Sequence, residues 1–87
     1  MKSKLPKLLI VDDERNMRES LKIVLESHGY KADTVESAEE GLESVPQNSY
    51  FMVITDARLD GMSGYEFLRE SHERWPDLPM LMITAYA

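Results

Sequence analysis

Three aspartates come directly after apolar stretches of the chain, and their carboxylates could do chemistry together. Asp12 and Asp13 follow the apolar run LLIV, and Asp56 follows the run FMVIT. Two like charges about 4 Å apart repel by about 1 kcal/mol in water and about 4 kcal/mol at an effective dielectric constant of 20. If the three carboxylates converge, a divalent cation would relieve this repulsion. Oxygen ligands without His or Cys favour Mg²⁺, with Mn²⁺ as an alternative.

A site of this kind suits phosphoryl transfer. Magnesium binds one or two carboxylates together with water and phosphate oxygens. A carboxylate beside the ion can attack a phosphoryl group while the metal neutralises charge on the transferring oxygens. Asp56 stands alone after its apolar run, so we predict that it is the nucleophile. Simpler interpretations remain open, since Asp13 could cap the following helix and Asp56 could form a turn before a glycine-containing loop.

The carboxylates can meet only if the apolar runs are neighbouring strands of one parallel sheet. Apolar runs predict strands over residues 7–11, 30–36, 50–55 and 80–84, and helical spacing with start and stop signals predicts helices over 15–28, 38–45 and about 65–74. The connections are too long for hairpins, so we predict an α/β fold with right-handed crossovers. In such sheets ligands bind beyond the carboxyl ends of the strands. We therefore expect the three aspartates at one edge of the sheet.

Local signals give each helix its expected bounds and its apolar face. Ser37 and Glu40 have capping-box spacing, and Pro46 is expected to end the second helix. In the third helix, Tyr65, Leu68 and His72 share one face. The first helix is predicted to be amphipathic and to stop at a glycine, from this set of apolar residues at helical spacing: Met17, Leu21, Val24 and Leu25.

Composition limits the classes of function. The 87 residues allow one small domain, and 43% hydrophobic residues are enough for a packed core. Ten basic against sixteen acidic residues give a net charge of −6, which argues against direct binding to nucleic acid phosphates. The first apolar run is too short for a signal peptide, and no run is long enough to span a membrane. Since the chain has no cysteine, we expect a cytoplasmic protein.

The segments LLIVDDE, VITDARLDGMSGYEF and MLMITAYA, in this order and at this separation, resemble the receiver domain of bacterial two-component response regulators. The resemblance covers residues 1–87 as a single domain and implies a flavodoxin-like parallel sheet with the strand order 2-1-3-4. The motifs DERNMRESL and ITAYA look most like receivers of the NtrC class, which control activators of an alternative sigma factor. The resemblance implies a sensor histidine kinase as partner and a DNA-binding output domain on a longer chain.

The resemblance also implies a role for each residue of the site. Asp12 and Asp13 would help to bind Mg²⁺, and Asp56 would complete the acid cluster and accept the phosphoryl group from the kinase. The main-chain carbonyl of Arg58 would be a further metal ligand. We expect no enzyme activity beyond the chain's own phosphorylation and dephosphorylation.

The third motif of the resemblance supplies a switch residue, and the family pattern then continues beyond this chain. The hydroxyl of Thr84 would swing toward the phosphoryl group, and Ala85 would be the small residue that leaves room for it. Taken alone, Thr84 is more simply an ordinary strand threonine. Receivers continue through a fourth helix, a fifth strand with an aromatic switch residue and a fifth helix, and they carry a lysine that contacts the phosphoryl group. We therefore expect an incomplete receiver with impaired transfer, or one that covers its exposed sheet by self-association.

Two other classes of function remain as alternatives. A phosphatase similar to haloacid dehalogenases would also place a nucleophilic aspartate after an apolar strand, but that family requires a second acid two residues later, where this chain has Arg58. A receiver-like interaction domain that accepts no phosphate is the other alternative. The products separate the three, because only a phosphatase gives many turnovers and only the interaction domain gives no adduct.

Overall fold

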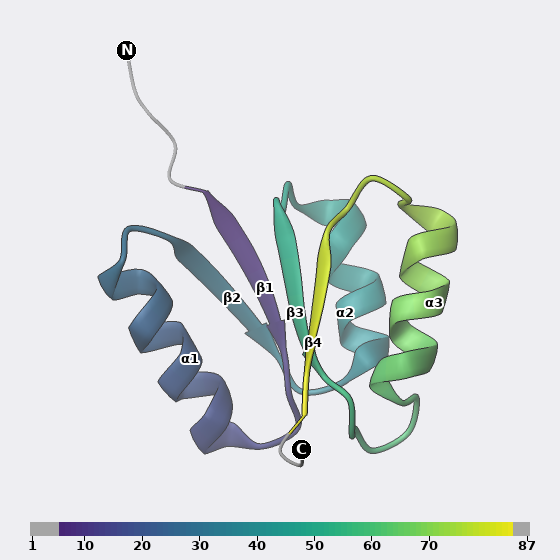
Figure 1. The fold of residues 1–87 in the computed structure, drawn as a ribbon, viewed down its shortest axis with the longest axis horizontal. Helices are drawn as coiled ribbons and strands as arrows, with labels where there is room; N and C mark the ends of the chain where they lie inside the picture. Colours follow the sequence, from purple (N-terminus) through teal and green to yellow (C-terminus); the bar gives the residue numbers. More distant parts are fainter. Residues whose placement is uncertain (1–5, 85–87) are drawn as a thin grey trace.

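The computed structural model describes residues 6–84, in which strands and helices alternate along the chain. The elements are β1 (Lys7–Val11), α1 (Arg15–Ser27), β2 (Lys31–Val35), α2 (Ala38–Ser44), the 3-10 turn η1 (Val45–Gln47), β3 (Met52–Asp56), α3 (Gly64–Arg74) and β4 (Met80–Ile83). Within residues 6–84 the strands form one parallel four-stranded sheet in the order β2-β1-β3-β4 (Figure 1). The predicted α/β fold and strand order are confirmed.

The bounds of the elements differ from the predicted ones by one or two residues, and some differences have a local cause. β3 includes Asp56 as its last residue because Asp56 pairs with Ile83 of β4. Pro46 lies within the 3-10 turn, Val45–Gln47, that directly follows α2, instead of simply ending the helix. The predicted capping box forms only in part, since Ser37 accepts a hydrogen bond from the Glu40 amide while the Glu40 carboxylate accepts one from the Glu36 amide.

The two faces of the sheet are covered unequally. α2 and α3 lie on one face, where the buried core consists of Leu9, Val11, Ala38, Val45, Val53 and Phe67. On this face α3 turns Gly64, Phe67 and Ser71 inward, one position away from the expected face, and Tyr65 is left 65% exposed. α1 covers the other face over β1 and β2, and none of its residues is buried. The amphipathic pattern of α1 therefore predicted a helix correctly but overstated its burial.

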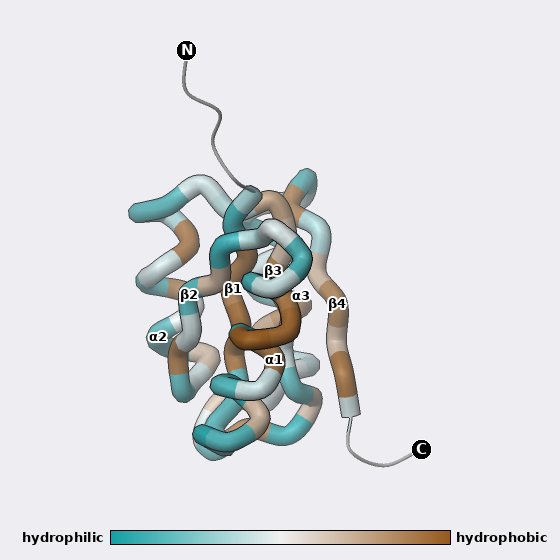
Figure 2. Tube along the Cα trace, turned by 90° about the vertical axis from the view of Figure 1, so that its left-hand side faces the viewer, coloured by the Kyte–Doolittle hydropathy of each residue, from teal (hydrophilic) through white to brown (hydrophobic). Residues whose placement is uncertain are grey.

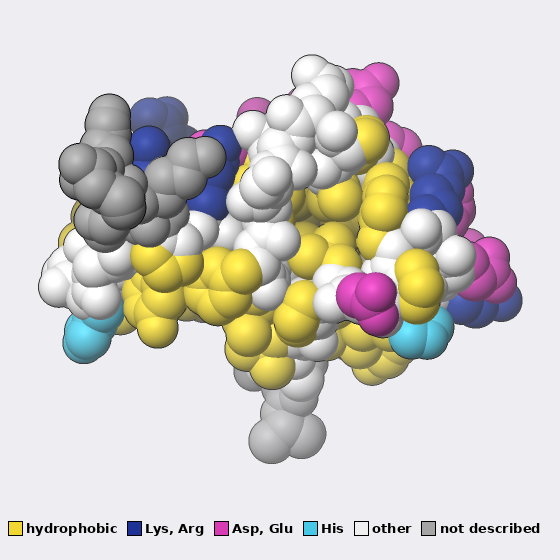
Figure 3. Space-filling view, turned by 90° about the horizontal axis from the view of Figure 1, so that it is seen from above, with side chains coloured by type: hydrophobic (Ala, Val, Ile, Leu, Met, Phe, Trp, Pro, Cys, Tyr) yellow, Lys and Arg dark blue, Asp and Glu magenta, His cyan; other side chains and the backbone are white. Residues whose placement is uncertain are grey.

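β4 is the margin of the sheet within the part of the chain that the structure describes, because it pairs only with β3. Figure 2 shows hydrophobic segments of β4 along the edge of the molecule, and Leu81 is 50% exposed. Figure 3 shows hydrophobic side chains gathered near the middle of the face that is seen from above, with charged side chains toward its margins. No helix among residues 6–84 is long and apolar enough to cross a membrane.

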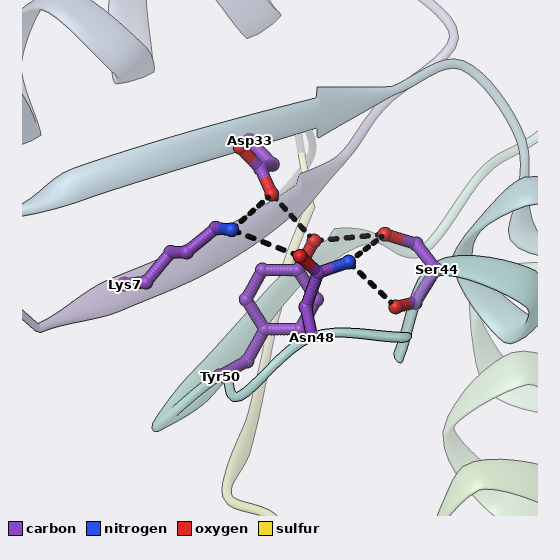
Figure 4. Close-up of polar contacts among 5 residues, drawn as sticks. All are labelled: Lys7, Asp33, Ser44, Asn48 and Tyr50. Carbon is purple, nitrogen blue, oxygen red and sulfur yellow. Dashed lines mark hydrogen bonds and ion pairs between the residues drawn. The ribbon is translucent and has the colours of Figure 1, made fainter. Parts of the chain in front are cut away.

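Five polar side chains near the amino ends of the strands form one network (Figure 4). The ammonium of Lys7 lies 3.1 Å from a carboxylate oxygen of Asp33 and donates a 2.9 Å hydrogen bond to the Asn48 side-chain oxygen. The Tyr50 hydroxyl donates to Asp33 at 2.7 Å and lies 2.8 Å from the Ser44 hydroxyl. The network ties the connection between α2 and β3 to β1 and β2.

The network also shifts the ionisation of its members. Burial alone would raise the pKa of Asp33, but the hydrogen bond from Tyr50 and the ammonium of Lys7 outweigh it and lower that pKa. Burial and the neighbouring carboxylate of Asp33 raise the pKa of Tyr50 to about 12, although the Ser44 hydroxyl opposes the shift. The carboxylate and the phenol therefore hold complementary protonation states, ionised and neutral, over the neutral pH range.

We predict that Tyr50→Phe lowers the free energy of unfolding at pH 7 by about 1 kcal/mol, because Asp33 and Ser44 lose their shared partner. A lowered carboxyl pKa contributes stability that is present above the unfolded pKa and is lost as the pH falls through the folded pKa. The difference between wild type and variant should therefore shrink below about pH 4. Urea unfolding followed by circular dichroism measures both effects. Tyr65→Phe, at a tyrosine that is 65% exposed, is the control, and an equal loss in both variants would contradict the assignment.

Candidate metal site

The register of the sheet brings the three predicted acids together. β1 and β3 pair in parallel with Val11 opposite Thr55, so the next residues, Asp12 and Asp56, follow at neighbouring strand ends. Asp13 is adjacent in sequence, and one carboxylate oxygen from each of the three residues lies within 4.8 Å of the others. The structure thus places all three carboxylates at the carboxyl ends of the strands, where parallel sheets bind their ligands.

Asp12 is the buried member of this acid cluster, with 2% of its surface exposed. Its carboxylate accepts a 2.9 Å hydrogen bond from the Glu14 amide. Burial raises the pKa of Asp12, the bond from Glu14 opposes the shift, and the negative charges of Asp56 and Asp13 add to the increase. The Arg18 guanidinium donates to the main-chain carbonyl of Asp12 at 2.9 Å and fixes the end of β1. The cluster therefore bears an electrostatic cost that a bound cation would relieve.

Asp13 does not cap the first helix, so that simpler interpretation is wrong. The N-cap of α1 is Glu14, which makes no side-chain capping bond, and it is Asp12 that accepts an amide hydrogen bond at the helix start. The exposed Asp13 carboxylate instead accepts a 3.3 Å hydrogen bond from the amide of Asp60 in the connection between β3 and α3. Asp13 therefore joins the end of β1 to that connection.

Asp56 is fixed between β3 and the start of α3. Its carboxylate accepts a 3.2 Å hydrogen bond from the Arg58 amide, two residues later, which is the contact of a turn-forming aspartate. The turn interpretation and a place in the acid cluster are therefore compatible. Gly64, the first residue of α3, packs so closely on the strand end that an added Cβ would lie 2.0 Å from the Asp56 carbonyl oxygen. Only glycine fits there, so the helix begins directly against the site.

The remaining predicted site residues lie at the same edge of the sheet. The Arg58 amide donates a hydrogen bond to the Asp56 carboxylate, so the backbone at Arg58 lies beside the acid cluster. Thr84 directly follows β4, whose last residue, Ile83, pairs with Asp56. Ala85 lies outside the described residues. The sequence did not predict the contacts of Arg18 and of the Asp60 amide. The position of Arg18 in the first turn of the helix after the acids was the signal that could have indicated its contact.

The chemistry of the donor set fits a hard divalent cation. The three clustered ligands are all carboxylates, without the imidazole or thiolate groups that would favour zinc or copper. Two of the three carboxylates are accessible to solvent, and the third is buried enough to be costly as an isolated charge. Mg²⁺ suits this combination because it keeps several waters and uses few protein ligands.

Comparisons with known proteins agree with the fold. A family model described as response regulator receiver domain matches residues 8–87. The response regulator protein FleR of Pseudomonas aeruginosa is 38% identical over 80 residues, 92% of this chain and 17% of its own length. The transcriptional regulatory protein GlrR of Escherichia coli is 35% identical over 79 residues, 91% of this chain and 18% of its own length. The expected likeness to the NtrC class is confirmed, since regulators of this class are among the relatives.

Solved structures match the chain closely. The response regulator protein TrrA from Thermotoga maritima, in complex with Mg(2+)-BeF, superposes with a TM-score of 0.92 at 38% identity, over 95% of this chain and 72% of that one. TrrA in complex with the histidine kinase ThkA gives a TM-score of 0.90 at 38% identity, with the same coverage. The chain thus spans under a fifth of the length of the curated relatives FleR and GlrR and about seven tenths of TrrA.

We predict that Asp12→Asn raises the free energy of unfolding in metal-free buffer at pH 7 by about 1 kcal/mol. The change removes a buried negative charge beside two others, while the asparagine oxygen can still accept the hydrogen bond from the Glu14 amide. A raised carboxyl pKa means that wild type gains stability as the pH falls through that pKa. The advantage of the variant should therefore fade in acid. Urea unfolding from pH 7 to pH 4 measures this.

Two further measurements sharpen this prediction. Asp77→Asn, at an exposed acid remote from the cluster in sequence, should change stability by only a few tenths of a kcal/mol. Millimolar Mg²⁺ should stabilise wild type but not Asp12→Asn, since an ion that binds only the folded protein stabilises it. A variant less stable than wild type at pH 7 in metal-free buffer would contradict the proposed repulsion.

Proposed function

Because this chain belongs to the response regulator receiver domain family, we propose that it accepts a phosphoryl group from a sensor histidine kinase onto Asp56. The convergence of Asp12, Asp13 and Asp56 on one point at the sheet edge is the observation that supports this most. Asp56 is partly exposed, so a large donor can reach its carboxylate, whereas Asp12 is buried. Its fixed position at the end of β3 suits it to in-line attack.

In the proposed reaction, each residue of the site has a separate task. Asp12, Asp13, Asp56 and the main-chain carbonyl of Arg58 would hold Mg²⁺, with Mn²⁺ as an alternative. When bound, the ion supplies positive charge that neutralises the phosphoryl oxygens. A carboxylate oxygen of Asp56 forms the new bond to phosphorus, the bond from phosphorus to the kinase histidine breaks, and its electron pair stays on that nitrogen. The Thr84 hydroxyl then moves toward the phosphoryl group.

The comparisons support this choice of partner and cofactor. TrrA, which is 38% identical to this chain, has been solved with a histidine kinase and separately with Mg(2+)-BeF. FleR and GlrR are named as a response regulator and a transcriptional regulator, and both are far longer than this chain. We therefore propose that residues 1–87 are part of a single receiver domain that acts in the cytoplasm and is attached to a DNA-binding activator in the longer protein.

The central prediction is that the chain gains a single phosphoryl group at Asp56. Incubation with Mg²⁺ and acetyl phosphate should give one adduct in the intact mass of wild type and none for Asp56→Asn. Asp60→Asn, a change at a nearby exposed acid outside the acid cluster, is the matched control and should still form the adduct. Removal of Mg²⁺ with EDTA should abolish the reaction.

The same experiment separates the alternative functions, because released phosphate is measured alongside the mass. Release of many equivalents of phosphate per chain, with no loss in Asp60→Asn, would favour a phosphatase. No adduct on wild type at any Mg²⁺ concentration would favour an interaction domain that binds without accepting phosphate.

We also propose that the margin of the sheet at β4 is covered by self-association when the 87-residue chain is alone. β4 presents an unpaired edge within the described residues, and Leu81 on it is half exposed. Sedimentation velocity should show association that grows with concentration, and Leu81→Glu should weaken it. A wild-type chain that stays monomeric and unfolds cooperatively would contradict this proposal.

A further inference from the structure

We propose that Glu39 is a positioning residue that holds the connection between β3 and α3 in the shape the metal site needs. Glu39 lies in the first turn of α2 and is absent from the acid cluster. The connection lies at the lower end of the molecule in Figure 1, and it contains Arg58, whose carbonyl is the proposed further metal ligand. The inference rests on the proposed function and extends it to a residue outside the site.

The contact itself is specific. One Glu39 carboxylate oxygen accepts a 3.2 Å hydrogen bond from the Met62 amide. The same oxygen would lie 3.1 Å from a Cβ added to Gly61, so the carboxylate rests directly against the glycine. Gly61 has φ of +76°, a conformation that only glycine adopts readily. Glu39 therefore meets the connection at its glycine with positive φ, where a side chain added to Gly61 would require an adjustment.

Glu39 completes a regular pattern of anchors along this connection. The amides of Arg58, Asp60 and Met62, every second residue, donate to carboxylates of Asp56, Asp13 and Glu39 respectively. These carboxylates come from β3, from the connection that follows β1, and from α2, so three separate parts of the chain hold one short segment. Each of these hydrogen bonds fixes one backbone amide of the segment and so restricts the backbone.

The three anchors differ in what a cation would do to them. Asp13 and Asp56 belong to the acid cluster, so a bound cation would compete with the Asp60 and Arg58 amides for their oxygens. Glu39 has no such second task, so its bond to Met62 stays unchanged when the site fills. The connection then keeps one fixed point while the other two adjust, and the Arg58 carbonyl remains near the metal position. Partners outside a metal's direct ligands commonly set its affinity in this way.

Three variants of α2 test the inference in the 87-residue chain. Glu39→Ala removes the acceptor, Glu39→Gln keeps an acceptor oxygen but loses the charge, and Glu43→Ala removes an exposed acid elsewhere on α2. Calorimetric titration with Mg²⁺ alone should show affinity about fivefold to tenfold weaker for Glu39→Ala. Glu39→Gln and Glu43→Ala should bind within about twofold of wild type, because the hydrogen bond and not the charge is what positions the connection.

A second readout needs no metal. Amide hydrogen exchange in metal-free buffer should be faster at Met62 in Glu39→Ala than in wild type, with β1 and β3 amides unchanged. With acetyl phosphate, the Mg²⁺ concentration for half-maximal phosphorylation should rise in Glu39→Ala, while the rate at saturating Mg²⁺ stays within about twofold, since the reacting groups are intact.

The outcomes distinguish this inference from the proposed function. Equal Mg²⁺ affinity in wild type and Glu39→Ala overturns the positioning role and leaves the metal site intact. Equal weakening in Glu39→Gln and Glu39→Ala also overturns it, since charge would then be the cause. Wild type that binds no Mg²⁺ overturns the metal site itself. If Glu39→Ala is unfolded by circular dichroism, Glu39→Asp serves instead, because the shorter side chain retracts the acceptor and should weaken Mg²⁺ binding at constant charge.

Discussion

Parallel pairing of β1 and β3 forces like charges together, and the rest of the structure depends on this constraint. β1 and β3 run in the same direction with Val11 opposite Thr55, so the acids that follow both strands cannot separate without breaking the sheet register. A shift of one residue would turn every core side chain of a strand to the other face, which the buried Leu9, Val11 and Val53 forbid. The favourable free energy of core packing therefore offsets the electrostatic repulsion within the acid cluster. The same packing keeps the carboxylates close enough together to bind a cation.

Aspartates at the two ends of the sheet have pKa values that are shifted in opposite directions. Near the amino ends, Asp33 has the ammonium of Lys7 and the hydroxyl of Tyr50 as partners, and its pKa is lowered. At the carboxyl ends, Asp12 is buried beside other carboxylates, and its pKa is raised. Charge that is neutralised within the fold serves stability, whereas charge that is left unbalanced serves binding. This contrast supports the carboxyl end of the sheet as the candidate site, independently of the comparisons with relatives.

The sequence was informative where periodicity and strand ends decide the structure. Apolar runs located all four described strands, and acids at their ends located the site at the sheet edge. The strand order came from the family resemblance, since periodicity alone does not say which strands are neighbours. Side-chain partners were less predictable. Asp12 and Asp13 are adjacent acids before a helix, yet Asp12 accepts a hydrogen bond from the Glu14 amide at the helix start while Asp13 accepts one from the Asp60 amide. No feature of the sequence indicated the contact of Glu39, because its partner is a backbone amide 23 residues away.

The connection between β3 and α3 links occupancy of the site to the shape of its surroundings. Asp13 and Asp56 each accept a hydrogen bond from an amide of this segment with a carboxylate that the proposed metal or phosphoryl group would also use. Any ligand that takes those oxygens must weaken the bonds to the segment, and by thermodynamic reciprocity any change that tightens the segment must alter the affinity for that ligand. Gly64 packs against the Asp56 carbonyl, so the start of α3 is part of the same unit. A change of charge at Asp56 therefore acts on this segment through the Arg58 amide, while the hydrogen bond from Met62 to Glu39 holds the segment at a second point.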